Sequence, residues 1–340
     1  MFFKNRKRSF IIAEISANHG QNFDRAVRMI KVAKQCGADA VKFQCYTPDT
    51  ITIDVNNKYF QVKHAKWRGQ TLYQLYKTAY TPWDWFRKLK IIADDLGLVF
   101  FATAFDKTSV DFLEELGVAF HKIASFELTD LPLIEYAAKK KKPLILSTGM
   151  ATIREIREAV NLAGESGAKD ITLLKCVSSY PASPKEMNLS TIADMKTRFG
   201  CKVGLSDHTL GIGASIAAVC LGASIIEKHF VLSRKENTPD SFFSIEPSEL
   251  KELVANIRIA EQAIGEIRYG LTNDEKKSSV FRRSLFAVKD IEKGGVISAE
   301  NMRSIRPANG IPPKYYNALL GRKARVSIKR GTPLKWEMVR

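Results

Sequence analysis

Two short stretches, Val203-Gly-Leu-Ser-Asp-His208 and Ile225-Ile-Glu-Lys-His229-Phe, share one pattern, a brief apolar run that ends in polar residues able to bind a metal. The apolar part of each stretch is typical of a buried β-strand. Each strand is expected to deliver its last three residues, 206–208 and 227–229, to one edge of a sheet. If the two strands are parallel neighbours, His208 and His229 converge.

The same alternation of apolar strand and amphipathic helix runs through the first 265 residues. Strands are expected at Phe10–Ser16, Asp39–Gln44, Leu98–Thr103, Ala119–Ser125, Pro143–Thr148, Ile171–Cys176, Lys202–Ser206 and Ala223–His229. Helices are expected at Phe23–Gln35, Trp83–Leu96, Lys107–Leu116, Leu131–Lys140, Ile153–Ser166, Leu189–Phe199, Gly213–Leu221 and Pro247–Ile264. Eight such units over this length predict an α/β fold, the (β/α)8 TIM barrel. A doubly wound open sheet is the alternative, but no G-x-G-x-x-G follows the first strand.

Two segments depart from this alternation. Residues 45–81 form a long aromatic insertion, which is expected to be functional or to have structure of its own. After the barrel domain (1–265), a polar linker (266–280) leads to a small β-rich domain (281–340) with strand-like runs at Ser284–Val288 and Ala324–Ile328. This last domain holds fourteen Lys and Arg against four Asp and Glu, so +10 of the formal charge of +17 lies there.

Composition excludes several classes of protein. The 340 residues are 45% hydrophobic, but no apolar run is long enough for a membrane span, and the N-terminus does not read as a signal peptide. Five scattered cysteines without a C-x-x-C spacing predict a reducing, cytoplasmic location. The basic residues are dispersed and no aromatic-basic RNA motif occurs, so no nucleic-acid partner is expected. An anionic substrate and a merely solvated basic surface both fit the charge.

The expected strand ends carry a coherent set of side chains, and in a TIM barrel these ends form the active site. Lys42 and Lys122 offer ammonium groups, and Thr103, Ser125, Ser147 and Ser206 offer hydroxyls. Together these groups suit a phosphate and a carboxylate on one small molecule. His208 and His229 could hold one divalent ion with most of its coordination open, as a Lewis acid requires. Glu14 and Glu127 are acid/base candidates, and Glu227 ends the eighth strand without an assigned role. Each has a structural alternative, since strand-end lysines also extend to solvent and a single buried histidine is often structural.

As a set, these residues lie in motifs that resemble the sialic acid synthase family. The barrel motifs are Ile12-Ala-Glu-Ile-Ser-Ala-Asn-His19, Val41-Lys-Phe-Gln44, His121-Lys-Ile-Ala-Ser125, Leu146-Ser-Thr-Gly-Met150, Gly204-Leu-Ser-Asp-His208 and Glu227-Lys-His229. Arg283-Ser-Leu285 and Arg306-Pro-Ala-Asn-Gly310 resemble the family's small C-terminal SAF, or antifreeze-like, domain. The resemblance covers essentially the whole chain.

The resemblance implies a transferase that condenses phosphoenolpyruvate with an open-chain acylamino sugar to give a nine-carbon 2-keto acid and phosphate. It implies a divalent metal, manganese by preference with magnesium or cobalt as alternatives, and a domain-swapped homodimer. The implied catalytic residues are Glu14, His208 and His229, and the two histidines are the metal ligands. The implied phosphoenolpyruvate contacts are Lys42, Thr103, Lys122, Ser125, Ser147, Ser178 and Ser206, where the family usually has Asn in place of Ser178. The implied sugar contacts are Gln44, Phe105, Glu127, Tyr180, Asp240 and Arg306, the last reaching into the partner subunit's barrel.

Two local features resemble the pseudaminic acid synthase branch of the family. They are Ala79-Tyr-Thr-Pro-Trp-Asp-Trp85 and Thr238-Pro-Asp-Ser-Phe-Phe-Ser-Ile-Glu-Pro247. This branch implies 2,4-diacetamido-2,4,6-trideoxy-L-altrose as the sugar and pseudaminic acid as the product. Synthesis of N-acetylneuraminate or legionaminate stays as the alternative. A Schiff-base aldolase that uses Lys42 or Lys122 is a more remote one.

Overall fold

The computed structural model describes residues 8–63 and 67–340. The chain divides into two compact units, Met1–Gly265 and Glu266–Arg340. Each unit has its own hydrophobic core. The two are therefore described separately.

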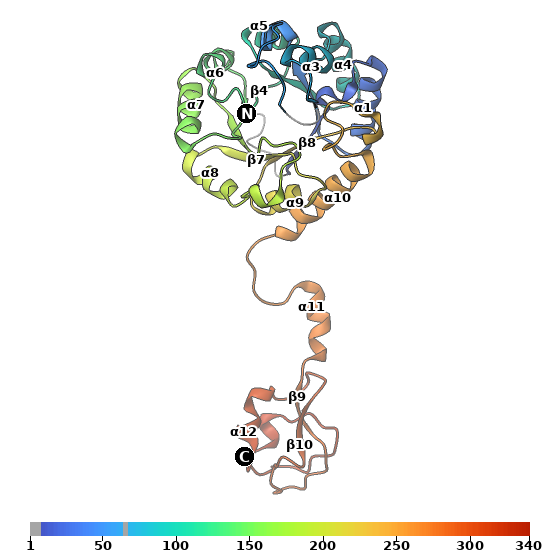
Figure 1. Cartoon of the computed structure of the whole chain (residues 1–340). Helices are drawn as coiled ribbons and strands as arrows, with labels where there is room; N and C mark the ends of the chain where they lie inside the picture. Colours follow the sequence, from blue (N-terminus) through green and yellow to red (C-terminus); the bar gives the residue numbers. More distant parts are fainter. Residues whose placement is uncertain (1–7, 64–66) are drawn as a thin grey trace. The chain divides into compact units, whose positions relative to one another are not determined.

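In the first unit, eight parallel strands close into a barrel in sequence order, with helices around the outside (Figure 1). The strands are β1 (Phe10–Glu14), β2 (Ala40–Cys45), β3 (Val99–Ala104), β4 (His121–Ile123), β5 (Leu144–Ser147), β6 (Ile171–Cys176), β7 (Lys202–Asp207) and β8 (Ile225–His229). The outer helices are α1 (Phe23–Gln35), α4 (Trp83–Asp95), α5 (Lys107–Glu115), α6 (Leu131–Ala138), α7 (Ile153–Glu165), α8 (Thr191–Phe199), α9 (Gly213–Cys220) and α10 (Pro247–Ile264). The predicted TIM barrel is confirmed.

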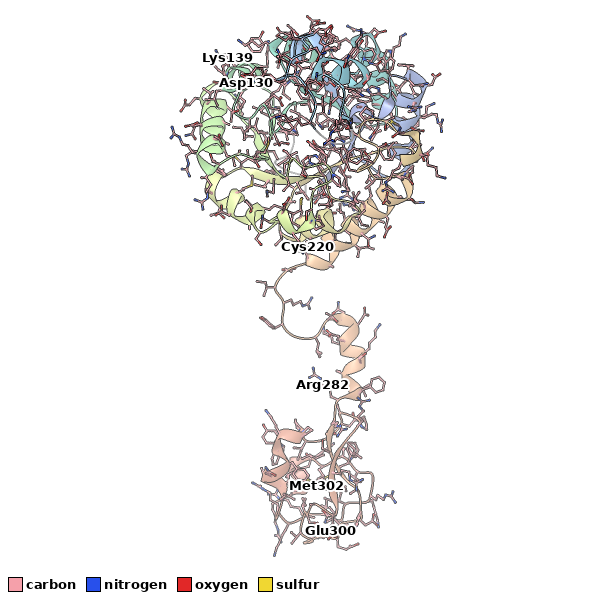
Figure 2. All side chains as sticks on the ribbon, viewed as in Figure 1. Asp130, Lys139, Cys220, Arg282, Glu300 and Met302 are labelled. Carbon is pink, nitrogen blue, oxygen red and sulfur yellow. The ribbon has the colours of Figure 1, made fainter. Side chains whose placement is uncertain are left out.

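Polar residues in the loops that follow the strands determine where several of these helices begin. Asn22 caps α1 by accepting from the amide of Arg25, and Asp106 caps α5 through the amide of Ser109. Asp130 caps α6 in the same way, and it lies on the outside of the barrel together with Lys139 at the other end of that helix (Figure 2). Each cap satisfies an amide that the helix itself leaves unpaired.

Differences from the sequence prediction are concentrated in short or irregular segments. β4 spans three residues instead of the seven expected at 119–125, and only Thr103 and Lys122 pair between β3 and β4. In its described residues, the aromatic insertion has the α-helices α2 (Pro48–Ile51) and α3 (Leu72–Ala79) and an isolated bridge between Gln61 and Thr71. Residues 64–66 of this insertion lie outside the described part of the chain.

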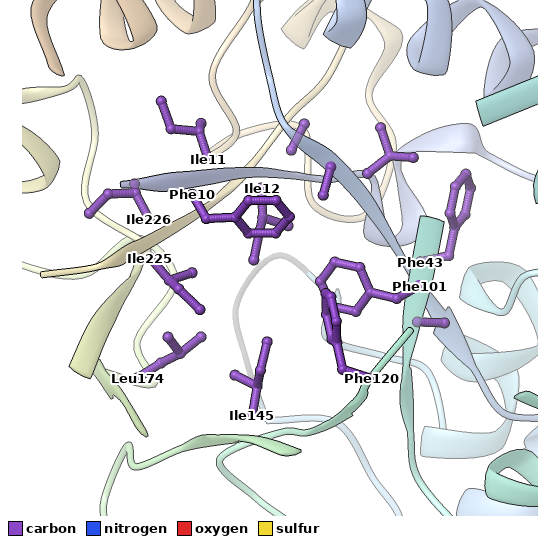
Figure 3. Close-up of a cluster of buried hydrophobic side chains, with 14 of the residues drawn as sticks. Phe10, Ile11, Ile12, Phe43, Phe101, Phe120, Ile145, Leu174, Ile225 and Ile226 are labelled. Atoms are coloured by element: carbon purple, nitrogen blue, oxygen red, sulfur yellow. The ribbon is translucent and has the colours of Figure 1, made fainter. Parts of the chain in front are cut away.

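The barrel is filled by every second residue of its strands, because strand side chains alternate between the two faces of a sheet. Figure 3 shows the side chains that meet in the centre of the barrel. They come from β1, β3, β5, β6 and β8 and from the residue just before β4, and they are Phe10, Ile12, Phe101, Phe120, Ile145, Leu174 and Ile225. Phe101 and Phe120 pack with their ring centroids 4.5 Å apart. Ile11 and Ile226 point outward to the helices (Figure 3).

The second unit contains the antiparallel pair β9 (Ser284–Ala287) and β10 (Met302–Ile305), together with α11 (Asn273–Ser278) and α12 (Tyr316–Leu319). The sequence did not predict β10, because its residues do not alternate between apolar and polar. Its second residue, Arg303, is exposed. The run Ala324–Ile328, predicted as a strand, makes only isolated bridges. Met302 is buried in the core of this unit, whereas Glu300 points to solvent (Figure 2).

No helix within residues 8–63 and 67–340 combines the length and apolar composition of a membrane span.

Gly204 on β7 occupies a position where the interior of the barrel has no room for a side chain. An added Cβ would lie 2.5 Å from the carbonyl oxygen of Ile225 and 2.7 Å from Leu174 Cδ2. We expect Gly204→Ala to lower the free energy of unfolding by about 1–3 kcal/mol through overpacking. Chemical denaturation of the full chain measures this change.

The matched control is Gly164→Ala in α7, where an added Cβ meets nothing within 4 Å. This change should stabilise the helix by about 0.5–1 kcal/mol, because glycine is the more flexible residue in the unfolded chain. Equal unfolding free energies for the two variants would contradict the packing described for β7.

Candidate active site

The C-terminal ends of the strands surround a small polar cavity of about 50 Å³. It is lined by Glu14, Lys42, Gln44, Thr103, Phe105, Lys122, Ala124, Ser125, Phe126, Ser147, Cys176, Tyr180, Ser206, His208, Glu227 and His229. These residues come from all eight strands or the loops that directly follow them. Most of the residues expected at the strand ends are therefore brought to one place.

Two carboxylates and one ammonium group form the centre of this cavity. Lys42 Nζ lies 2.9 Å from Glu14 Oε2 and 3.6 Å from Glu227 Oε1, and all three side chains are buried. Burial raises the pKa of Glu14 to about 7, against the lowering effect of Lys42 and with a further rise caused by Glu227. Burial also raises the pKa of Glu227, but Lys42 and Lys122 lower it by more, so its net pKa is below the ordinary value. At neutral pH, Glu227 is ionised and Glu14 is poised between its two protonation states.

A second buried ammonium group faces the hydroxyl side of the cavity. Lys122 Nζ donates to Ser147 Oγ at 2.7 Å and to the carbonyl of Ile123 at 3.0 Å, while Lys42 Nζ donates to Thr103 Oγ1 at 2.9 Å. Burial lowers the pKa of Lys122 to about 8, and the neighbouring charge of Lys42 adds to this effect. Both lysines therefore point into one cavity and are held there by hydroxyl partners.

The backbone after β5 contributes a close approach between loops. The amide of Gly149 donates to Ser125 Oγ at 3.1 Å. A Cβ at position 149 would overlap Ser178 Oγ and would lie 2.8 Å from Ser125 Oγ. Only glycine leaves these two hydroxyls free to face the cavity, which explains the glycine in the Leu146–Met150 motif.

His208 and His229 converge as predicted, with ring centroids 5.3 Å apart. Tyr180 and Phe243 form a shared aromatic wall, Tyr180 at 4.4 Å from the His208 ring and Phe243 at 4.7 Å from the His229 ring. Because strand side chains alternate between the two faces of the sheet, however, the residue just before each histidine points outward. The expectation that Asp207 and Lys228 also face the site is wrong, since they pair with each other away from it.

The two imidazoles have the chemistry of an open metal site. His208 Nδ1 bonds the carbonyl of Val177 at 2.9 Å, so that nitrogen carries the proton and Nε2 holds the lone pair. Burial, with the nearby His208 and Lys42, lowers the pKa of His229 well below its ordinary value, which keeps this ring neutral. Within residues 8–63 and 67–340, His229 Nδ1 is buried without a hydrogen-bond partner. These features fit a divalent cation.

Cys176 adds a thiol beside the His208 ring, with Sγ 3.8 Å from Nδ1. Burial raises the pKa of Cys176, but His208, Ser125 and Lys122 together lower it to about 7. Burial in turn lowers the pKa of His208, but Cys176, the Val177 carbonyl and Glu227 together raise it above its ordinary value. A cation on His208 would compete with the ring proton, so its binding weakens as the pH falls.

In the described part of the chain, no group of three or more His, Cys, Asp and Glu is arranged to hold a metal ion. Two imidazoles leave most coordination positions of a cation free for substrate oxygens or water. This is the arrangement expected of a Lewis acid site, and it differs from a closed structural site.

A larger cavity of about 430 Å³ adjoins the polar one and shares with it Gln44, Phe126, Tyr180 and His229. Its remaining lining is Ala17, Tyr46, Gln61, Val62, Lys63, Trp67, Leu72, Leu75, Tyr76, Ala79, Ser178, Pro239 and Asp240. The aromatic insertion supplies much of this wall through α3 and the segment before it. Its expected functional role thus has a structural basis.

Asp240 reaches the cavity because the β1 loop anchors the loop that follows β8. Asn18 donates to the carbonyl of Phe230 at 2.9 Å and accepts from Thr238 at 2.7 Å. Ser16 donates to Asp240 Oδ2 and accepts from Gln44 at 2.8 Å. Gln44 and Asp240, both expected to contact a sugar, are therefore linked through one hydroxyl.

Two further expected sugar contacts, Glu127 and Arg306, stay predictions. Glu127 follows β4 but lines neither cavity. Arg306 is exposed directly after β10 in the second unit. Its implied role in a swapped dimer stays a prediction.

Several residues of the site had no predicted role, among them Glu227, Cys176, Ser16 and Phe243. Glu227 lies two positions before the inward-facing His229 and Cys176 ends β6, so strand alternation could have indicated both. Ser16 and Phe243 lie in loops, where no periodic pattern indicates which way a side chain points.

The fold and the site together define a TIM-barrel enzyme with a metal-capable pair of histidines beside a cationic, hydroxyl-rich cavity. Residues 29–269 match the NeuB family, and residues 282–340 match the SAF domain. The chain belongs to the NeuB family. It is accordingly a phosphoenolpyruvate-dependent nonulosonic acid synthase, a transferase whose family acts on an acylamino sugar and is generally metal-dependent.

Relatives of known name extend over the full chain. The pseudaminic acid synthase of Campylobacter jejuni is 43% identical, over 98% of this chain and 97% of the relative. The N,N'-diacetyllegionaminic acid synthase of the same species is 40% identical, over 95% and 98%. The crystal structure of N-acetylneuraminic acid synthetase from Leptospira borgpetersenii in complex with citrate matches with a TM-score of 0.70 at 34% identity, over 80% of this chain and 90% of that one.

The pKa of Lys122 predicts a pH dependence for use of the anionic substrate. This ammonium group is charged below about pH 8 and becomes neutral above it. We expect kcat/KM for phosphoenolpyruvate to fall about tenfold for each pH unit above 8, since kcat/KM reports the ionisation of the free enzyme. Steady-state rates between pH 6.5 and 9.5 measure the profile.

Lys122→Arg is the control, because a guanidinium stays charged over this range. Its absolute rate is expected to be lower, but its alkaline limb should be flat up to pH 9.5. The same alkaline fall in both proteins would show that another group causes it.

Proposed function

We propose that this enzyme is a pseudaminic acid synthase, which condenses phosphoenolpyruvate with 2,4-diacetamido-2,4,6-trideoxy-L-altrose to give pseudaminic acid and phosphate. The observation that carries the choice of sugar is the 43% identity, over nearly the full length of both chains, to a protein of that name. The wall of the larger cavity supports it. Val62, Leu72, Leu75 and Ala79 form an apolar surface suited to the methyl group of a 6-deoxy sugar.

Legionaminic acid synthesis is the second candidate, because the relative of that name is 40% identical. That difference in identity is small. The stereochemistry of the sugar, which decides between the two, must be read by the polar groups on the cavity wall. Gln44, Tyr180 and Asp240 are the groups that we propose for this role.

In the polar cavity, we assign phosphoenolpyruvate to Lys42, Lys122 and the surrounding hydroxyls. The two ammonium groups offset the charges of the phosphate and the carboxylate, and their effect is strong because the site is buried. Ser125, Ser147 and Thr103 orient the oxygens as hydrogen-bond donors, and Ser206 lines the same cavity while donating to Glu227 Oε1 at 2.9 Å. We include Ser178 because its hydroxyl lies beside that of Ser125.

The bond-forming step joins C3 of phosphoenolpyruvate to the aldehyde carbon of the open-chain sugar. Water then adds at C2, and the resulting tetrahedral centre expels phosphate. Glu14, with its pKa raised to about 7, is placed to hold and return the proton in these steps. A divalent cation, manganese by preference, held by His208 and His229 would supply Lewis acidity toward the sugar carbonyl.

The direct test is a phosphate-release assay of the full chain with manganese, phosphoenolpyruvate and a panel of sugars. We expect the altrose-configured diacetamido sugar to exceed its manno-configured isomer and N-acetylmannosamine by at least about a hundredfold in kcat/KM, since mispaired buried hydroxyls are costly. Glu14→Gln, which keeps the size of the side chain, provides the background rate.

A higher kcat/KM for the manno-configured sugar would transfer the assignment to legionaminate synthesis. Phosphate release that does not depend on any sugar of the panel would contradict both candidates.

A further inference from the structure

The outward side of β7 and β8 carries a buried ion pair directly behind the two histidines. Asp207 and Lys228 are partners in the register of the two strands, and Lys228 Nζ lies 2.9 Å from Asp207 Oδ2. Their side chains are 0% and 2% exposed. Each residue is the immediate neighbour in sequence of a histidine, His208 or His229, whose ring points the other way, into the site.

Every polar atom of this pair that the contacts describe is engaged by nearby groups. Asp207 Oδ1 accepts from the amide and the hydroxyl of Thr209, both at 2.8 Å, and Oδ2 also accepts from Ser215 Oγ at 2.6 Å. Lys228 Nζ donates to the carbonyl of Thr209 at 2.7 Å. The residues on both sides of His208 are therefore fixed, and they are tied through Lys228 to the strand that carries His229.

Stability alone does not account for an ion pair at this position. Removing two charges from water costs about as much as their attraction returns, and apolar residues of similar size are often as stabilising. Leucine and methionine are apolar residues of similar size that could occupy these positions beneath α9. What an apolar pair cannot provide is a directional link between the ends of two adjacent strands.

We propose that Asp207, Lys228, Thr209 and Ser215 form a positioning cluster that sets the separation and orientation of the His208 and His229 imidazoles for a divalent cation. The proposal rests on the metal role assigned to the two histidines under the proposed function. None of the four residues lines either cavity, so they are positioning residues. They act through the ends of β7 and β8.

Direct manganese binding to the full chain, without substrates, tests the proposal. The electron paramagnetic resonance signal of free Mn²⁺ gives the Kd without reference to turnover. We expect Lys228→Met, which keeps the length of the side chain but removes the charge, to weaken Mn²⁺ binding about tenfold or more, as changes behind metal ligands do.

Arg258→Met is the matched control. Arg258 in α10 pairs with Asp39 at 3.2 Å, and Asp39 lies just before β2, at the opposite end of the barrel from the histidines. This variant also removes a cation from a carboxylate partner, so its thermal stability should fall. Its Kd for Mn²⁺ should stay within about twofold of the wild type, since the change is remote from the ligands.

Should Lys228→Met fail to fold, Ser215→Ala decides by the same criterion. It removes a single hydrogen bond to Asp207, and we expect about a threefold rise in Kd from the loosened cluster. If the folded variant that is measured binds Mn²⁺ with the Kd of the wild type, the positioning role is overturned. A wild-type chain that binds no Mn²⁺ overturns the metal role of the histidines, and this proposal with it.

Discussion

The fixed register of eight parallel strands, with side chains alternating inward and outward, is the constraint on which the rest of this structure depends. Glu14 pairs in register with Lys42 on one side and with His229 on the other. Two residues before Glu14 and Lys42 the interior is apolar, with Ile12 and Ala40, and on β8 the apolar Ile225 lies two residues before Glu227. A shift of two residues along a strand therefore leads from the hydrophobic core to the charged cavity, and the reactive groups lie directly next to packed apolar side chains.

The position of these reactive groups next to the apolar core determines their pKa values. Glu14, Lys42, Lys122 and Glu227 are all buried, so the charge state of each depends strongly on the others. Burial brings the pKa of Glu14 up to about 7 and that of Lys122 down to about 8. The charge state of the cavity is thus balanced near neutral pH. A bound anion would shift this balance toward protonated side chains, which suits a site that receives a phosphate and a carboxylate and must also transfer a proton.

The sequence was sufficient to predict the barrel because each strand is a continuous apolar run and each helix an amphipathic one. It was also sufficient to predict that His208 and His229 converge, since equivalent ends of adjacent parallel strands meet at one edge. Periodicity failed where tertiary contacts decide the structure. β4 retains only three residues of its apolar run, and β10 is a strand despite the exposed Arg303.

The same limit applies to the site. Strict alternation would have turned Asp207 and Lys228 outward and given Glu227 a place beside Lys42, had it been applied residue by residue. No sequence pattern, however, predicts that Ser16 links Gln44 to Asp240, because this link depends on how two loops fold over each other. Sequence patterns do not predict the preferred sugar for the same reason, since this preference depends on the cavity walls that loops and the aromatic insertion form.

We propose that the ends of β7 and β8 together hold one divalent cation at the edge of a cationic cavity. Anomalous diffraction at the manganese edge, from crystals of the full chain grown with Mn²⁺, tests it most directly. We expect one strong peak bonded to Nε2 of His208 and to a ring nitrogen of His229. A peak elsewhere, or none at these two rings, would contradict it.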